Sequence, residues 1–333
     1  MSFPATRPRR LRRSAAMRNL VSETAVSVND LVAPLFVRDG ITEPVPVPSM
    51  PGVLQHTMKS LVAEATELQT LGVPAVIVFG IPEHKDASGS GARSPDGIVQ
   101  RALGELRQEL GSSLVLIADL CLDEYTDHGH CGVLTSDGAI DNDATLEIYA
   151  EIAVSQARAG ADIVAPSGMM DGQVAAVRSA LDENAAADVA ILAYSAKYAS
   201  AMYAPFRDAA QVRIAGGAGS GSGSGDRSAY QQDFRNVREA LTEVALDVEE
   251  GADIVMVKPA LPCLDVIAKV RAAVDIPVAA FQVSGEYAMI KAGAQLGWID
   301  GPAVMRDHMA AIKRAGASPI LTYFAKDLAM EMT

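Results

Sequence analysis

The sequence predicts a (β/α)8 barrel with an N-terminal arm, and three observations predict it. Short β-branched runs recur eight times at barrel-like spacing, segments with apolar residues at helical spacing lie between most of them, and glycine follows several of those segments. Strands that alternate with helices predict a parallel sheet, and eight units favour a closed barrel over an open doubly wound sheet. We expect an arm for subunit contacts at residues 1–25 and one catalytic barrel domain at 26–333.

The predicted helices and strands follow one another in a regular order. Helical segments such as 61–68 and 146–154 carry apolar residues three or four positions apart. They end at glycines that suit a left-handed C-cap, and a strand follows within a few residues each time: Gly72, Gly111, Gly160, Gly251 and Gly316. The expected strands span residues 31–37, 75–79, 114–119, 163–166, 190–194, 254–258, 278–283 and 320–324.

Three connections, at residues 81–96, 121–143 and 204–233, are too long for simple turns, and all three leave the carboxyl ends of strands. Long loops in a compact domain are usually functional, and barrel enzymes place their active sites at this face. The third connection contains a Gly/Ser run at 216–225. We interpret residues 204–233 as an active-site lid, with an inert linker as the alternative.

Composition excludes several classes of protein. No apolar stretch approaches the roughly 20 residues of a membrane helix, and the N-terminal arginines precede no apolar signal core. We therefore expect a cytoplasmic protein with no membrane partner.

The cysteines Cys121, Cys131 and Cys263 are too few for a disulfide framework and indicate reduced thiols or metal ligands.

Charge is distributed unevenly along the chain. The formal net charge is −13, yet residues 1–20 carry six arginines and no acidic residue. The acidic remainder argues against a nucleic-acid partner. We interpret the basic segment 7–13 as an arm that packs on an acidic neighbouring subunit, and a polyanion-binding tail or a targeting segment remains the alternative.

Two lysines occupy positions that are hard to explain structurally. Lys258 ends the run 254–258, and Lys197 closely follows the run 190–194, so both should face the barrel mouth. Apolar surroundings lower the pKa of an ammonium group, and the neutral amine attacks a ketone to form a Schiff base. A solvated charge or a salt bridge better explains one such lysine alone, but two on consecutive strands favour catalysis.

Polar residues at other strand ends surround the same mouth. Asp119, Ser167, Ser284 and Tyr323 follow or end four of the predicted strands. Each of them alone is better explained as a turn or capping residue. Together they suit the binding of carboxylates or amines on a small substrate.

The loop at residues 119–131 packs two thiols, several acids and two histidines into thirteen positions. Thiolate and imidazole suit zinc, and three protein ligands with one open position are typical of a catalytic site. Cys121, Asp123 and Cys131 are the predicted zinc ligands. His128 and His130 are interpreted as polar loop residues or as partners of the ligands.

Taken together, these features resemble the porphobilinogen synthase (5-aminolevulinate dehydratase) family from about Arg9 to Tyr323. The segments that carry the resemblance are APSGMMDGQ at 165–173, YSAKYAS at 194–200, YAPFRDA at 203–209, GADIVMVKPA at 251–260 and QVSGEYAMIK at 282–291. The resemblance implies a hydro-lyase of tetrapyrrole (heme) biosynthesis, which condenses two 5-aminolevulinate molecules to porphobilinogen with loss of two waters.

The resemblance also implies a role for each matching residue. Lys197 and Lys258 match the family's Schiff-base lysines, and Lys258 would hold the substrate that becomes the propionate side of the product. Ser284 and Tyr323 match the groups that bind the carboxylate of that substrate. Asp119 and Ser167 match polar residues of the pocket. The residues that match contacts to the second substrate's carboxylate are Arg207, Arg227 and Gln231.

Metals and assembly are implied in the same way. Glu243 matches an acidic position that holds an allosteric magnesium ion in many members, although an ordinary exposed helix acid explains it nearly as well. Zinc-dependent members carry three cysteines in the loop, whereas this chain has Asp123 at the middle position, so we expect zinc to bind loosely. Cys263 stands where the family usually has tyrosine. Members assemble as octamers through an N-terminal arm.

Two other functions are compatible with the same barrel. A lysine-dependent aldolase would need one Schiff base and no metal loop, so the cysteine loop argues against it. A catalytically silent barrel that senses metal or supports an assembly would lack some of the lysines or arginines named above, and none is missing.

Overall fold

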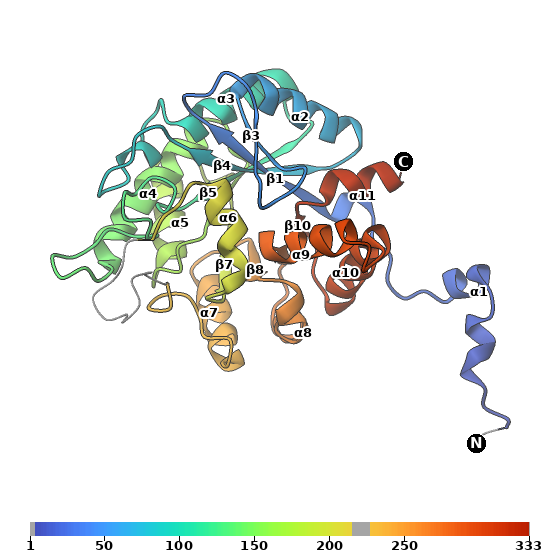
Figure 1. Cartoon of the computed structure of the whole chain (residues 1–333). Coiled ribbons are helices and arrows are strands. Elements are labelled where there is room, and N and C mark those ends of the chain that lie inside the picture. The colour runs from blue at the N-terminus through green and yellow to red at the C-terminus, as the bar shows by residue number, and fades with distance from the viewer. Residues whose placement is uncertain (1–3, 215–226, 333) are drawn as a thin grey trace.

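The computed structural model describes residues 4–214 and 227–332 of the chain. It confirms the predicted barrel, because eight parallel strands pair in sequence and the last strand pairs with the first. Figure 1 shows the strands at the centre with helices around them. The barrel strands are β1 (Leu31–Arg38), β4 (Ala75–Ile81), β5 (Val115–Leu120), β6 (Ile163–Pro166), β7 (Ala190–Lys197), β8 (Ile254–Lys258), β9 (Val278–Gln282) and β10 (Ile320–Thr322).

Helices cover the outside of the barrel, and their apolar faces pack on the strands. Most of them connect one strand to the next, as a barrel requires. They are α2 (Met58–Thr70), α3 (Ile98–Leu110), α4 (Asn142–Arg158), α5 (Gln173–Glu183), α6 (Ala204–Ala209), α7 (Val237–Glu249), α8 (Leu264–Ala273), α9 (Ser284–Gln295), α10 (Gly301–Ala315) and α11 (Ala325–Met332).

The five glycines predicted to end helices all have positive φ, from 57° at Gly111 to 114° at Gly316. A side chain in this region of backbone space is disfavoured, so glycine suits each of these corners. The boundaries of β6 and β8 are as predicted, and those of the other barrel strands differ from the prediction by one to three residues. The largest difference is at β7, which continues past Tyr194 to Lys197.

A small hairpin that the sequence did not predict lies beside β1. Strand β3 (Leu54–His56) pairs parallel with the end of β1, and β2 (Val45–Pro46) pairs antiparallel with β3. Both strands are too short to show the alternation by which strands are recognised. The hairpin extends the barrel wall at the mouth, where Gln55 is buried.

The N-terminal arm stands away from the barrel in Figure 1. It contains a 3-10 helix at Pro8–Arg12 and α1 (Ala15–Leu20), and neither has a buried residue. Leu20 is 79% exposed, which leaves its apolar side chain without cover. Within residues 4–214 and 227–332, no helix is both long and apolar enough to cross a membrane.

The proposed lid is described only in part. A 3-10 helix at Ala201–Tyr203 precedes the lid, whose first limb consists of α6 and the residues up to 214 and whose second limb begins at Arg227. The Gly/Ser run at 216–225 and Asp226 lie outside the described residues.

Candidate active site

Lys197 and Lys258 are the last residues of two neighbouring strands, and they lie opposite each other in the register of β7 and β8. The register shifts between Ala193 and Ala196, so a bulge adjusts β7 just before its lysine. Side chains paired on adjacent parallel strands point to the same face of the sheet. Both lysines are buried, with 5% exposure for Lys197 and 6% for Lys258.

Aromatic rings surround the ammonium group of Lys258. Its Nζ lies 4.4 Å from the ring centroid of Phe281 and 5.0 Å from that of Tyr194. The rings of Tyr203 and Phe206 are 5.2 and 5.5 Å away. Burial, followed by the charge of Lys197, lowers the pKa of Lys258 to about 7. A large fraction of this amine is therefore neutral near pH 7.

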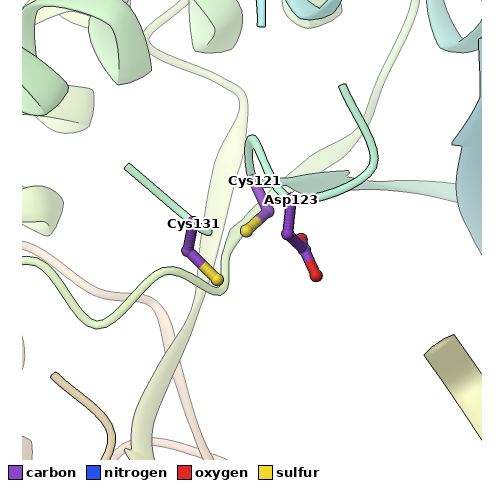
Figure 2. A group of neighbouring side chains, drawn as sticks. All are labelled: Cys121, Asp123 and Cys131. Carbon is purple, nitrogen blue, oxygen red and sulfur yellow. The ribbon is translucent and has the colours of Figure 1, made fainter. Parts of the chain in front are cut away.

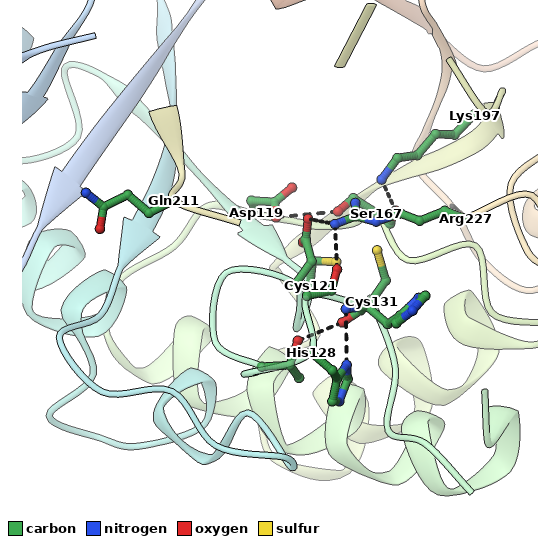
Figure 3. A network of polar contacts seen from close by, with 12 residues as sticks. Asp119, Cys121, His128, Cys131, Ser167, Lys197, Gln211 and Arg227 are labelled. Carbon is green, nitrogen blue, oxygen red and sulfur yellow. Dashed lines mark hydrogen bonds and ion pairs between the residues drawn. The ribbon is translucent and has the colours of Figure 1, made fainter. Parts of the chain in front are cut away.

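Lys197 lies beside the ends of β5 and β6, as Figure 3 shows. Its Nζ donates to the backbone oxygen of Ser167 at 2.5 Å, and the Ser167 hydroxyl donates to Asp119 at 3.4 Å. The other carboxylate oxygen of Asp119 is buried and has no partner among the described residues. Burial and the nearby charge of Asp123 raise the pKa of Asp119 to about 7. Asp119 can therefore accept or donate a proton near neutral pH.

The three predicted metal ligands lie together in the loop after β5, as Figure 2 shows. One ligand atom from each of Cys121, Asp123 and Cys131 falls within 4.8 Å of the others, and all three residues are buried. Tyr149 of α4 supports the cluster, since its hydroxyl donates to the backbone oxygen of Cys131 at 2.7 Å. Only glycine fits at position 168, because a Cβ there would lie 1.8 Å from that hydroxyl oxygen.

Two thiols and a carboxylate this close together fit a zinc ion. Zinc binds thiolate ligands well, whereas harder cations such as magnesium prefer oxygen ligands. Burial raises the pKa of the Cys121 thiol well above its ordinary value. Burial also opposes ionisation of Cys131, but a hydrogen bond with Cys121 and the charge of Arg227 outweigh it and lower the Cys131 pKa to about 6. One thiolate therefore forms readily in this loop.

The histidines of the loop have other contacts. Nδ1 of His128 accepts from the backbone N–H of His130 at 3.2 Å, and Nε2 of His128 is 3.2 Å from the backbone oxygen of Ala87. Both ring nitrogens of His128 thus bind the backbone. His130 contacts the Tyr230 hydroxyl through Nδ1 at 3.2 Å. None of these three contacts involves the side chains of Cys121, Asp123 or Cys131, which fits the interpretation of both histidines as polar loop residues.

Arg227, at the start of the second lid limb, reaches into the metal loop. Its Nη2 lies 2.7 Å from Oδ2 of Asp123, and both side chains are 5% exposed. The same nitrogen donates to the backbone oxygen of Gly129 at 2.8 Å. Burial alone would raise the pKa of Asp123, but Arg227 and then Lys197 lower it below its ordinary value. Asp123 is therefore charged at neutral pH.

Neighbouring loops hold the first lid limb against the mouth. The hydroxyl of Ser284 accepts from the backbone N–H of Phe206 at 3.0 Å, and Gln55 donates to the backbone oxygen of Ala209 at 2.6 Å. Lys85 donates to the backbone oxygen of Gln211 at 2.9 Å. The Nε atom of Arg207 is buried and has no partner among the described residues, so it remains available to an anion.

One cavity gathers most of the predicted residues. It is lined by Phe79, Asp119, Asp123, Glu124, Ser167, Lys197, Tyr203, Phe206, Arg207, Arg227 and Lys258.

Six predicted residues do not line this cavity, and two of them, Cys121 and Cys131, belong to the metal cluster described above. The ring of Tyr323 lies 5.9 Å from that of Phe281, and its buried hydroxyl has no partner in the described part of the chain. Ser284 is engaged with the lid limb, as described above. Gln231 and Glu243 line a neighbouring cavity together with Asp171.

Comparison with known proteins assigns the chain to a family. The model of the delta-aminolevulinic acid dehydratase family matches residues 5–331. The chain belongs to this family. It is 55% identical to the delta-aminolevulinic acid dehydratase of Streptomyces coelicolor over 98% of this chain and 97% of that one. It is 53% identical to the enzyme of Mycobacterium tuberculosis, over 100% and 99% of the two chains.

A solved structure is similar over nearly the whole fold. It is the delta-aminolevulinic acid dehydratase of Toxoplasma gondii in complex with the reaction product porphobilinogen. The TM-score is 0.93 at 42% identity, and the alignment covers 98% of this chain and 91% of that one. The resemblance identified from the sequence segments is thus confirmed at the level of the delta-aminolevulinic acid dehydratase family.

Sequence reasoning missed several residues of this candidate site. It assigned no role to the rings of Tyr194, Tyr203, Phe206 and Phe281, which enclose Lys258. Three of them lie in the quoted segments and Phe281 lies next to one. For Tyr194 and Phe281, the position in the last residues of a predicted strand was the available signal. Glu124 was also missed, although its buried Oε1 has no partner among described residues and the side chain lines the cavity.

Proposed function

We propose that this chain is a porphobilinogen synthase, which condenses two molecules of 5-aminolevulinate to porphobilinogen with loss of two waters in tetrapyrrole (heme) biosynthesis. The observation that carries the proposal is the pair of buried lysines at adjacent strand ends. Membership of the delta-aminolevulinic acid dehydratase family supports the same reaction. An aldolase would need only one such lysine.

Lys258 would begin the reaction. Its neutral amine attacks the ketone carbon of one 5-aminolevulinate, and loss of water leaves an imine on Nζ. The depressed pKa of Lys258 supports this role, because the nucleophile is present near pH 7. We assign the carboxylate of this substrate to Ser284 and Tyr323. The free buried hydroxyl of Tyr323 supports that assignment, since it lacks a protein partner in the described structure.

Lys197 would form the second Schiff base, beside Asp119 and Ser167. Asp119 is suited to proton transfer there, because its pKa is raised to about 7. We assign the second carboxylate to Arg207, Arg227 and Gln231. Each of these has a buried nitrogen without a partner in the described chain, namely Nε of both arginines and Nε2 of Gln231. Unsatisfied buried donors favour an anionic ligand.

Metal binding forms part of the proposal. Cys121, Asp123 and Cys131 would hold a zinc ion, and the close packing of two thiols with a carboxylate supports that choice. A zinc ion bound there would supply Lewis acidity toward the second substrate's amine or a water. Glu243 would hold an allosteric magnesium ion through water. The acidic neighbours Asp171 and Glu239 in the same cavity support a divalent cation.

The arm would join subunits of a homo-oligomer, for which we propose an octamer. Its support is the exposure of Leu11, Leu20 and Val21 on a basic segment, and the rest of the chain is acidic. We assign the protein to the cytoplasm. All three cysteines are free thiols, and a reducing compartment keeps thiols in that state.

The proposed function is tested by incubating the purified chain with 5-aminolevulinate and zinc and detecting the pyrrole by its colour reaction and by NMR. Porphobilinogen should accumulate at half the molar rate at which 5-aminolevulinate disappears. A chain that consumes no 5-aminolevulinate under these conditions is not a porphobilinogen synthase.

The rate of imine formation at Lys258 should follow the ionisation of its amine. We expect borohydride trapping of 5-aminolevulinate to rise with pH and to level off above about pH 7, since burial and Lys197 lower the Lys258 pKa to that value. An ordinary lysine would need a pH near 10. Lys197→Met removes one of the two causes and should move the midpoint upward. A midpoint near 10 in the unmodified chain would contradict the proposed role of Lys258.

Replacement of either lid arginine should lower turnover much more than it lowers borohydride trapping of the first substrate at Lys258. We expect Arg207→Ala and Arg227→Ala to reduce porphobilinogen formation by about two orders of magnitude, because the second substrate loses a charged anchor. Borohydride trapping at Lys258 should change by less than about threefold. The matched control is Arg235→Ala, whose exposed side chain pairs with Asp233 outside the cavity. Equal losses of trapping and turnover would mean that these arginines do not serve the second substrate.

A further inference from the structure

The carboxylate of Asp123 takes part in two interactions. It belongs to the cluster with Cys121 and Cys131, whose ligand atoms lie within 4.8 Å of one another. It also forms an ion pair with Arg227 at 2.7 Å. Both side chains of this ion pair are 5% exposed, so water screens it little. One buried carboxylate therefore connects the metal loop to the second limb of the lid.

We propose that Asp123 is shared between the metal site and Arg227, so that metal binding and the Arg227–Asp123 ion pair weaken each other. Metal binding then releases Arg227 to a substrate carboxylate. The proposal deepens the proposed function, because it takes from it the role of Arg227 in substrate binding. The competition for Asp123 itself depends only on the geometry of the loop.

Charge is the physical basis of the competition. A divalent cation at the cluster and the guanidinium of Arg227 are both attracted to the carboxylate, and they repel each other across a buried, poorly screened site. Arg227 withdraws electron density from the carboxylate that would act as a metal ligand. Each cation therefore lowers the affinity of Asp123 for the other.

Arg227 is also equipped to bind a second anion. Its Nη2 contacts Asp123 and the backbone oxygen of Gly129, while its buried Nε has no partner among the described residues. A guanidinium whose donors are only partly used suits a further carboxylate. The close approach of the loop to the lid supports this link, since a Cβ on Gly129 would lie 2.3 Å from the backbone oxygen of Arg213.

Aspartate at position 123 makes this coupling possible. A carboxylate presents two oxygens, so it can contact a metal ion and a guanidinium together, whereas a thiolate presents one large sulfur atom. A chain with cysteine at this position would keep the metal ligand and lose the geometry of the ion pair. By linkage, the factor by which Arg227 weakens metal binding equals the factor by which metal binding weakens the ion pair.

The test measures zinc affinity without substrate, by competition with a chromophoric chelator on the full chain. Arg227→Gln should bind zinc about tenfold more tightly than the unmodified chain. Arg207→Gln is the matched control, because it removes a nearby arginine that lacks an ion pair with Asp123, and it should change the affinity by less than about threefold. A double-mutant cycle completes the test: on an Asp123→Cys background, Arg227→Gln should have an effect below about threefold.

Several outcomes would overturn the proposal. Equal tightening in Arg207→Gln and Arg227→Gln would indicate general charge repulsion, and weaker zinc binding in Arg227→Gln would mean that Arg227 orients Asp123 for the metal. An effect of Arg227→Gln that persists on the Asp123→Cys background would exclude Asp123 as the shared group. If circular dichroism indicates that Arg227→Gln is unfolded, Arg227→Met takes its place, since it also removes the charge, and unchanged zinc affinity in that variant contradicts the proposal.

Failure of the inference is distinct from failure of the proposed function. Porphobilinogen formation by the unmodified chain tests the function, whereas zinc affinity tests the sharing of Asp123 with no turnover involved. A chain that makes porphobilinogen but has the same zinc affinity in Arg227→Gln keeps the function and loses the inference.

Discussion

Replacement of Lys258 by alanine is expected to lower the rate of porphobilinogen formation by at least about three orders of magnitude. The amine is the nucleophile, and the imine that it forms also orients the first substrate, so both contributions fail together. The expected loss is measured by steady-state pyrrole formation and by mass spectrometry after borohydride reduction, which should find no substrate attached at position 258.

Lys258→Arg should be no better than Lys258→Ala, because a guanidinium stays protonated and forms no imine. Lys258→Arg keeps a positive charge at this position, so it controls for the loss of charge in Lys258→Ala. Lys59→Met, a change at an exposed lysine of α2, controls for nonspecific labelling. Substrate attached mainly to exposed lysines of the unmodified chain, with turnover preserved in Lys258→Ala, would disprove the assignment.

The barrel could be predicted because its physical signals are local. Each of the eight strands is an apolar run with punctuation on either side, and the five glycines predicted at helix ends have positive φ. The hairpin of β2 and β3 was not predicted, since strands of two and three residues carry no periodicity. Strand β7 extends further than expected because polar residues Ser195 and Lys197 lie in its buried end.

The site residues at strand ends could be predicted from the sequence. The contacts between loops that are distant in the sequence could not. The sequence placed Lys197 and Lys258 at adjacent strand ends, and the register pairs them. No sequence pattern could reveal the ion pair of Asp123 with Arg227, because its partners are more than a hundred residues apart. The same limit applies to Ser284, whose hydroxyl donates to the backbone oxygen of Met202, just before the lid, and accepts from the backbone N–H of Phe206 in the first lid limb.

Combined replacement of Cys121 and Cys131 by alanine is expected to abolish measurable zinc binding and to reduce porphobilinogen formation by about 100-fold or more. The change removes both soft donors of the cluster and leaves Asp123, which already pairs with Arg227. A single carboxylate is a poor site for zinc. Zinc content by elemental analysis and pyrrole formation before and after chelation measure the two effects.

Trapping of 5-aminolevulinate at Lys258 should persist in the double variant within about threefold, because the aromatic rings and Lys197, rather than the thiols, set the environment of that amine. The matched control is Cys263→Ala, which removes the one buried thiol that lies outside the metal loop and should retain both zinc and turnover.

Chelation of the unmodified chain should lower activity reversibly, and magnesium alone should not restore it. Full turnover in the Cys121→Ala, Cys131→Ala variant, or full recovery of the chelated chain with magnesium alone, would mean that the thiols of this loop support no step of the reaction.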